Sequence, residues 1–174
     1  MLGRIVQVAT NTVSSPTALI DFGGVIDSND IYMLVFTNVI PETDANDIKI
    51  RITESGTAQS DANYDFAYKR LRTDTTFNDS ASTNDNEGDF ATSIGNDTGE
   101  ACSGIVYIYN AYDANEHTMF TVAQIQLSNG ALLIGSRGGV VYTQASQVDG
   151  IEIFPQAGST NFSSGTFTMY KVVD

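Results

Sequence analysis

The segment 84–89 carries side-chain oxygens at alternate positions around a glycine, which is the kind of donor that Ca²⁺ prefers in proteins. An EF-hand loop requires a bidentate glutamate at its twelfth position, and Ile94 stands there when the loop is counted from residue 83. We therefore interpret the segment as a solvated acidic loop whose carboxylates Asp85, Glu87 and Asp89 face a partner. Structural calcium is the alternative, and otherwise the sequence predicts no cofactor.

Nucleophilic catalysis needs a serine or cysteine beside a base, and the chain offers few such residues. Ser136 lies in a glycine-rich run without the Gly-x-Ser-x-Gly elbow that exposes a nucleophile. Cys102 follows Glu100, whose charge disfavours a reactive thiolate. One histidine, His117, and one cysteine supply neither a zinc cluster nor an internal disulfide. The sequence thus predicts a protein that is not an enzyme, with Cys102 buried and His117 in an exposed turn.

Five of the eight basic residues lie in two neighbouring candidate strands: Lys49, Arg51, Lys69, Arg70 and Arg72. If these strands pair, their basic face would attract the acidic loop of the same chain or of a neighbouring subunit. An ordinary charged surface exposed to solvent is the alternative. We take the last three of these bases as candidate contacts with another subunit or with another protein.

Strands are the elements that must position these side chains. In the segment 47–53, isoleucine alternates strictly with charged or hydroxyl residues, which is typical of a strand with one buried face. Similar patterns or short apolar runs predict further strands at 5–8, 18–22, 31–36, 64–72, 104–109, 121–127, 131–134, 140–143, 150–154 and 166–172. We expect an all-β protein, an antiparallel β-sandwich of jelly-roll type with about 8–10 short strands and little helix.

Two segments between the strands have a distinct composition. Asn129-Gly130 predicts a two-residue type I′ turn, and therefore a hairpin of 121–127 with 131–135. The segment 73–100 contains seven acids and no base, and its polar composition predicts one long acidic loop. We expect a single domain over residues 1–174, with residues 1–13 as an N-terminal arm.

Length and charge exclude several classes of function. A chain of 174 residues with 41% hydrophobic residues is typical of one globular domain. Its formal net charge of −13 repels phosphate backbones and anionic headgroups, so we expect neither a nucleic-acid nor a membrane partner. No apolar run reaches the ~20 residues of a spanning helix, and the start lacks the apolar region of a secretory signal. We expect synthesis in a cytoplasm without secretion.

The closing segment 148–172 resembles the C-terminal end of small β-sandwich virion proteins of tailed bacteriophages. Those proteins tend to end with a strand Ile-x-Ile-x-Pro, a glycine-containing loop ending Asn-Phe-x-x-Gly-Ser/Thr, and a last strand x-Leu-Tyr-Gly-Ile/Val. The matching residues here are Ile151, Ile153, Pro155, Asn161, Phe162, Gly165, Thr166, Met169, Tyr170 and Val172. Lys171 departs from the glycine of that family, and the segment 73–100 is more acidic than the family leads us to expect.

The resemblance implies a jelly-roll-like sandwich without catalytic residues, carried on the virion. It favours a capsid decoration, or cement, protein that binds the major capsid protein as a homo-oligomer, with a trimer favoured. The alternative is a tail-fibre or receptor-binding component that recognises a cell-surface glycan.

The arm itself suggests a way to fasten such a protein to a shell. An apolar strand can add to the sheet edge of a neighbour. The candidate contact residues of the arm are Leu2, Arg4, Ile5, Val6 and Val8.

Overall fold

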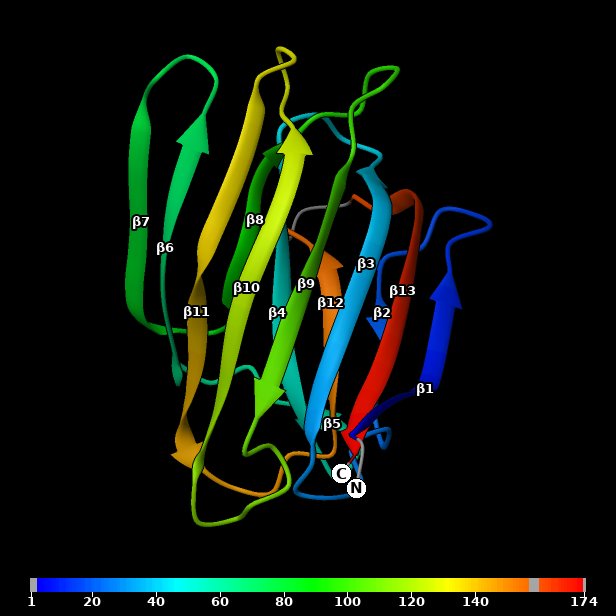
Figure 1. Cartoon of the computed structure of the whole chain (residues 1–174), viewed down its shortest axis with the longest axis vertical. Coiled ribbons are helices and arrows are strands. Elements are labelled where there is room, and N and C mark those ends of the chain that lie inside the picture. Colours follow the sequence, from blue (N-terminus) through cyan, green and yellow to red (C-terminus); the bar gives the residue numbers. More distant parts are fainter. Residues whose placement is uncertain (1–2, 157–159, 174) are drawn as a thin grey trace.

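Most of the predicted alternation forms strands in the computed structural model, which describes residues 3–156 and 160–173 (Figure 1). The strands are β1 (Arg4–Thr12), β2 (Ile20–Asp21), β3 (Ile31–Pro41), β4 (Asn46–Glu54), β5 (Thr57–Ala58), β6 (Tyr64–Arg72), β7 (Phe77–Asp85), β8 (Gly88–Ile94), β9 (Cys102–Tyr109), β10 (His117–Leu127), β11 (Leu133–Ala145), β12 (Gly150–Pro155) and β13 (Phe162–Val173). The described residues contain no helix, which agrees with the all-β prediction.

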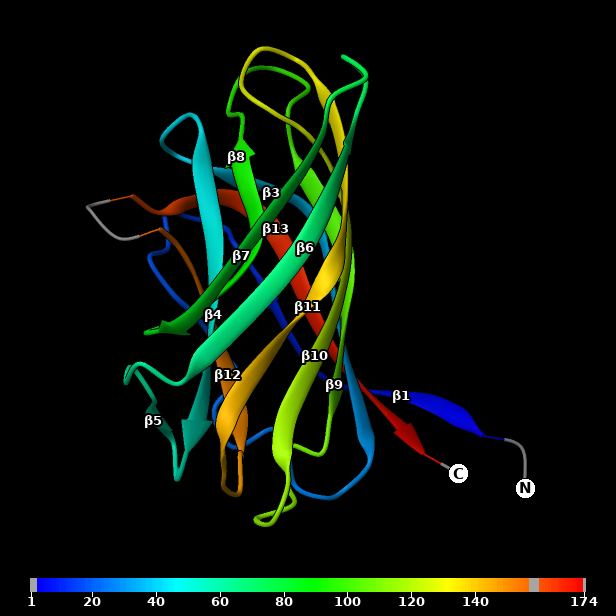
Figure 2. The same cartoon turned by 90° about the vertical axis from the view of Figure 1, so that its left-hand side faces the viewer.

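The strands form two sheets that pack against each other (Figure 2). The larger sheet has the order β1-β13-β3-β9-β10-β11-β6-β7. The smaller sheet has the order β2-β12-β4-β5, and β8 also pairs with β4. All of these pairings are antiparallel, as predicted.

Eight of the strands pair in the nested order of a jelly roll. β1 pairs with β13, β2 with β12, β3 with β9 and β4 with β8. Among these eight strands, the first thus pairs with the last, the second with the second to last, and so on inwards. This order confirms the predicted jelly-roll type. The described residues form 13 strands instead of the predicted 8–10, and four of them, β3, β10, β11 and β13, are 11–13 residues long. We call the eight nested strands the jelly-roll body. The strands β10, β11, β6 and β7 continue the larger sheet beyond β9, on the left in Figure 1, and we call them the sheet extension.

Aromatic and branched side chains fill the core of the jelly-roll body. Phe36 meets Phe90 edge to face with ring centroids 5.4 Å apart, and it stacks on Phe167 at 6.5 Å. The isoleucines of the 47–53 pattern, Ile48, Ile50 and Ile52, are fully buried. Burial of apolar side chains on this scale is what holds the two sheets together.

The prediction of one long loop over residues 73–100 is wrong. The segment contains β7, which pairs with β6 at the edge of the larger sheet, and β8, which pairs with β4 in the smaller one. Both faces of β7 carry polar residues, so its sequence shows no apolar alternation. In β8, Phe90, Ala91 and Ile94 are buried, and backbone pairing orders a stretch whose composition is that of a loop.

The predicted hairpin exists, but its turn and its second strand differ from the prediction. β10 pairs with β11, and the positive φ values fall at Gly130 and Ala131 instead of at Asn129 and Gly130. The loop closes through Ser128, whose N–H donates to the carbonyl of Leu132 at 3.0 Å. The two strands predicted at 131–134 and 140–143 are one strand, with the glycine-rich run inside it.

Candidate interaction surfaces

The outer face of the sheet extension, which points away from the smaller sheet, is apolar and exposed. Ile125 of β10 lies opposite Gly135 of β11, which lies opposite Leu71 of β6, and Leu71 lies opposite Phe77 of β7. Phe77 is 62% exposed and Ile125 is 53% exposed. Exposed apolar patches of this extent typically mark sites where proteins bind other molecules.

Small residues hollow out this face. Thr121, Gly139, Ala67 and Ala81 stand opposite one another across β10, β11, β6 and β7. They line a hollow of about 510 Å³ whose walls include Met119. We call this hollow and its neighbours along β10 and β11 the outer trough.

The outer trough continues from this hollow along the glycine-rich run of β11. A second hollow of about 510 Å³ is lined by residues that include Tyr107, Thr121 and Arg137. Further hollows of about 390 and 300 Å³ follow it towards Leu71 and Leu133. Because these hollows share lining residues, the outer trough runs across most of the outer face of the sheet extension.

The outer face of the sheet extension is electrically balanced although the whole chain is strongly acidic. The paired strand residues on this face include two acids, Asp65 and Asp79, and two bases, Lys69 and Arg137. Lys69 and Asp79 form an exposed ion pair with Nζ and Oδ1 3.2 Å apart. Most of the net charge of −13 therefore lies elsewhere on the molecule.

The second exposed apolar surface is β1. It is an edge strand, and Figure 2 shows it projecting from the body of the molecule together with the end of β13. The predicted arm residues Ile5, Val6 and Val8 are 59%, 37% and 39% exposed, and Arg4 is exposed as well. Leu2 lies outside the described residues. The arm is thus a strand of its own chain, paired with β13 on one side and open on the other.

The two basic strands do not pair with each other, because β4 and β6 lie in different sheets. Several of their bases nevertheless bind acids of the segment 73–100 in the same chain. Arg51 Nη2 lies 2.7 Å from Glu87 Oε2, and Arg72 Nη2 lies 2.7 Å from Asp74 Oδ2.

The predicted partner-facing role of the acidic residues conflicts with their positions. Asp89 is only 5% exposed, and Glu87 is held by Arg51. Asp85 lies half-buried at the end of β7, opposite Tyr64. Glu87 and Asp89 therefore form ion pairs within the chain, with Arg51 and Lys49 of β4.

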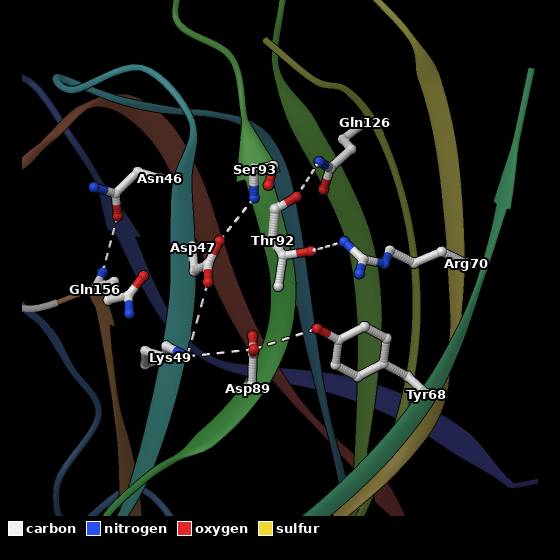
Figure 3. Close-up of polar contacts among 10 residues, drawn as sticks. All are labelled: Asn46, Asp47, Lys49, Tyr68, Arg70, Asp89, Thr92, Ser93, Gln126 and Gln156. Carbon is white, nitrogen blue, oxygen red and sulfur yellow. Dashed lines mark hydrogen bonds and ion pairs between the residues drawn. The ribbon is translucent and has the colours of Figure 1, made fainter. Parts of the chain in front are cut away.

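Six side chains that carry polar groups meet between the two sheets (Figure 3). We call them the interior polar cluster: Lys49, Tyr68, Arg70, Asp89, Thr92 and Gln126. Lys49 Nζ lies 3.3 Å from Asp89 Oδ2 and 4.0 Å from Asp47 Oδ2. The Tyr68 hydroxyl donates to Asp89 Oδ2 at 3.3 Å. Burial of the carboxylate, which the attraction of Lys49 only partly offsets, raises the pKa of Asp89 to about 6.

The rest of the interior polar cluster leaves several polar atoms without partners. Arg70 Nη1 donates to Thr92 Oγ1 at 2.8 Å, and Gln126 Nε2 donates to the Thr92 carbonyl at 2.6 Å. Four buried atoms in and beside the cluster have no hydrogen-bond partner among the described residues: Arg70 Nε, Asn78 Oδ1, Asp89 Oδ1 and Gln126 Oε1. Each such group costs about 1–3 kcal/mol, so the interior polar cluster stabilises the fold poorly.

The candidate nucleophiles do not converge. His117 and Ser136 lie seven positions apart along the pairing of β10 with β11, and the buried Ser136 hydroxyl accepts a hydrogen bond from Gln124 Nε2 at 2.8 Å. Cys102 is fully buried, as predicted, and burial raises the pKa of its thiol. Across residues 3–156 and 160–173, no three His, Cys, Asp or Glu side chains form a group suited to a metal ion.

Sequence reasoning missed the outer trough, although part of its signal was present. Tyr107 and Tyr109 share the outer face of β9 and stack with ring centroids 6.4 Å apart, which agrees with their spacing of two. In β10, Met119 and Ile125 alternate with buried residues, but this alternation does not tell which face of the strand packs against the second sheet. The order of the strands in the two sheets decides that, and a single sequence does not reveal this order.

Comparisons with protein-family models and with curated proteins find no match for this chain. The resemblance of the closing segment to phage virion proteins therefore stays a prediction. In the part of the chain that the structure describes, no helix is long and apolar enough to cross a membrane.

Proposed function

We propose that this protein is a non-enzymatic structural protein that works by binding other protein surfaces. The observation that carries the proposal is the exposed, apolar outer face of the sheet extension, whose few charges balance one another on a chain of net charge −13. Protein interfaces are rich in aromatic and apolar side chains. The open apolar edge of β1 adds a second surface suited to the same task.

Within this class, we propose a capsid decoration protein of a tailed bacteriophage, bound to the major capsid protein on the outside of the shell as a homo-oligomer, most simply a trimer. The support is the resemblance of the segment 148–172 together with the jelly-roll pairing of the strands. A protein of this kind stabilises contacts between shell subunits by burying apolar surface between them. The protein needs no cofactor for this role.

The copy number of the chain in purified phage particles tests the proposal. Quantitative mass spectrometry would compare peptides of this chain with peptides of the major capsid protein. A ratio approaching one supports a decoration protein, whereas a few copies per particle would move the protein to the tail. Absence from particles would overturn the virion role.

A tail-fibre or receptor-binding component is the second candidate, and one observation favours it. Tyr107, which stacks on Tyr109, lines the same hollow as Arg137, and an aromatic side chain beside a charged donor suits a sugar. A glycan array with the wild type and Tyr107→Ala distinguishes the candidates. Glycan binding that the substitution abolishes supports this function, and no binding supports the decoration protein.

A further inference from the structure

We propose that β1 of one copy packs into the outer trough of the next copy, so that the protein assembles head to tail. The inference rests on the proposed structural function and names the partner as a second copy of this chain. Figure 1 shows β1 at one edge of the eight-stranded sheet and the sheet extension at the other end, and the outer trough lies mainly on the sheet extension. One copy therefore cannot bring its own β1 onto its own outer trough.

The shapes of the two surfaces are complementary. β1 offers branched side chains on both faces, because Ile5 points the same way as its outer-face neighbour Val172 while Val6 points the opposite way. The outer trough offers a floor of small residues, Ala67, Ala81 and Gly139, on which such side chains can rest. Both surfaces are exposed in the single chain, so burial of each against the other removes apolar area from water.

Charge favours a second copy at these two places. Two copies of net charge −13 repel each other at most orientations. β1 contains no acid and one base, Arg4, whereas the outer face of the sheet extension carries Asp65 and Asp79 beside its two bases. A contact between β1 and the outer trough is thus free of net repulsion, and Arg4 can meet an acid of the neighbour.

The contact is heterologous, because it joins two different surfaces of the chain. An isologous contact between two outer troughs would face hollow against hollow and would leave β1 uncovered. A heterologous contact repeats from copy to copy, and it closes into a ring when the rotation between copies allows. A ring of three would fit the trimer proposed above.

Two variants and two matched controls test the contact by sedimentation velocity. Ile5→Asp places a charge on β1, and Ala67→Arg fills the hollow with a long charged side chain at an exposed position. The controls Leu19→Asp and Ala114→Arg make exchanges of the same kind at exposed positions that lie outside β1 and outside the lining of the outer trough. We expect an oligomer for the wild type and both controls. For each test variant, we expect a dissociation constant raised about 30-fold or more, as for loss of a central interface residue.

Mixing the two test variants decides the geometry. The intact β1 of the Ala67→Arg copy can still occupy the intact outer trough of the Ile5→Asp copy, so a mixture should form a 1:1 heterodimer while each variant alone stays monomeric. Monomers in the mixture would overturn the head-to-tail contact in favour of an isologous one. Circular dichroism verifies that each variant is folded.

Failure here is distinguishable from failure of the proposed function. A wild type that is monomeric yet present in particles at near parity with the capsid protein would overturn this contact and leave the decoration role standing. A wild-type oligomer that depends on Ile5 and Ala67 but is absent from particles would support this contact and overturn the decoration role.

Discussion

The jelly-roll body buries mainly apolar side chains, whereas the sheet extension buries apolar and polar side chains on one face. In the jelly-roll body, the inner faces carry aromatic and branched residues such as Phe36, Phe90 and Phe167. In the sheet extension, one end of the inner face adds Phe120 and Val140 to the same core, and the other end buries polar residues such as Arg70 and Gln126. The two regions share one sheet, and the polarity of its faces changes along it.

This difference teaches which region folds the chain and which is available for contacts. Burial of apolar area provides most of the free energy of folding, and the jelly-roll body provides most of that burial. The sheet extension buries several unpartnered polar atoms and leaves apolar side chains in water, neither of which favours the folded monomer. A region with these features gains stability when its outer face is covered.

The largest expected effect comes from removing an aromatic ring in the jelly-roll body. Phe36→Ala should lower the free energy of unfolding by about 3–5 kcal/mol, because Phe36 is fully buried and its loss leaves a cavity beside Phe90 and Phe167. Denaturant unfolding measures the change. The matched change Phe77→Ala on the outer face should alter it by no more than about 0.5 kcal/mol. Equal losses at the two positions would remove the distinction between the regions.

The next effect depends on pH and concerns the carboxylate between the two regions. The pKa of Asp89 is about 6 in the folded protein and near 3.8 when unfolded, so the folded state binds the extra proton between these values. Stability should therefore increase as the pH falls from about 7 to 4.5, by about 2 kcal/mol for this group.

The variant Asp89→Asn isolates this contribution, because it cannot titrate. The free energy of unfolding, measured by denaturant between pH 4.5 and 7 for both proteins, should differ in its pH dependence by that amount. Parallel curves would show that the buried Lys49 neutralises the cost of burying Asp89, and that the interior polar cluster is not a weak point.

In both regions, the sequence predicted strands that alternate apolar and polar residues and missed the polar strands β7 and β8, for a physical reason. Strands with one buried and one wet face alternate visibly, as in 47–53, and the prediction at 64–72 matches the bounds of β6. β7 alternates polar residues with small or exposed ones, so its pairing with β6 leaves no apolar pattern. β8 is buried although it contains the acidic Asp89, because Lys49 of β4 lies opposite Asp89 and forms an ion pair with it.

The candidate contact residues were predictable only in part. The strand β1 was predictable from Ile5, Val6 and Val8, because branched residues at short spacing favour a strand. The outer trough was not, since it requires knowing that β6 follows β11 in the sheet although about 70 residues separate them in the chain. The partners of Glu87 and Asp89 were equally hidden, because β4 and β8 approach only when the jelly roll is closed.

The smallest expected effect distinguishes two glycines of the same strand in the sheet extension. A side chain at Gly138 would point inward and meet the Ala67 carbonyl at 2.1 Å and Tyr68 Cβ at 2.4 Å, so β6 and β11 would have to separate. Gly138→Ala should therefore lower the free energy of unfolding by about 1–3 kcal/mol. At Gly135 the nearest atom to an added Cβ is the Gln124 carbonyl at 3.9 Å, and Gly135→Ala should change stability by less than about 0.5 kcal/mol. Thermal unfolding of both variants at one pH compares them. If Gly138→Ala is as well tolerated as Gly135→Ala, then β11 can move away from β6, and the floor of the outer trough is not held at the depth that the head-to-tail contact requires.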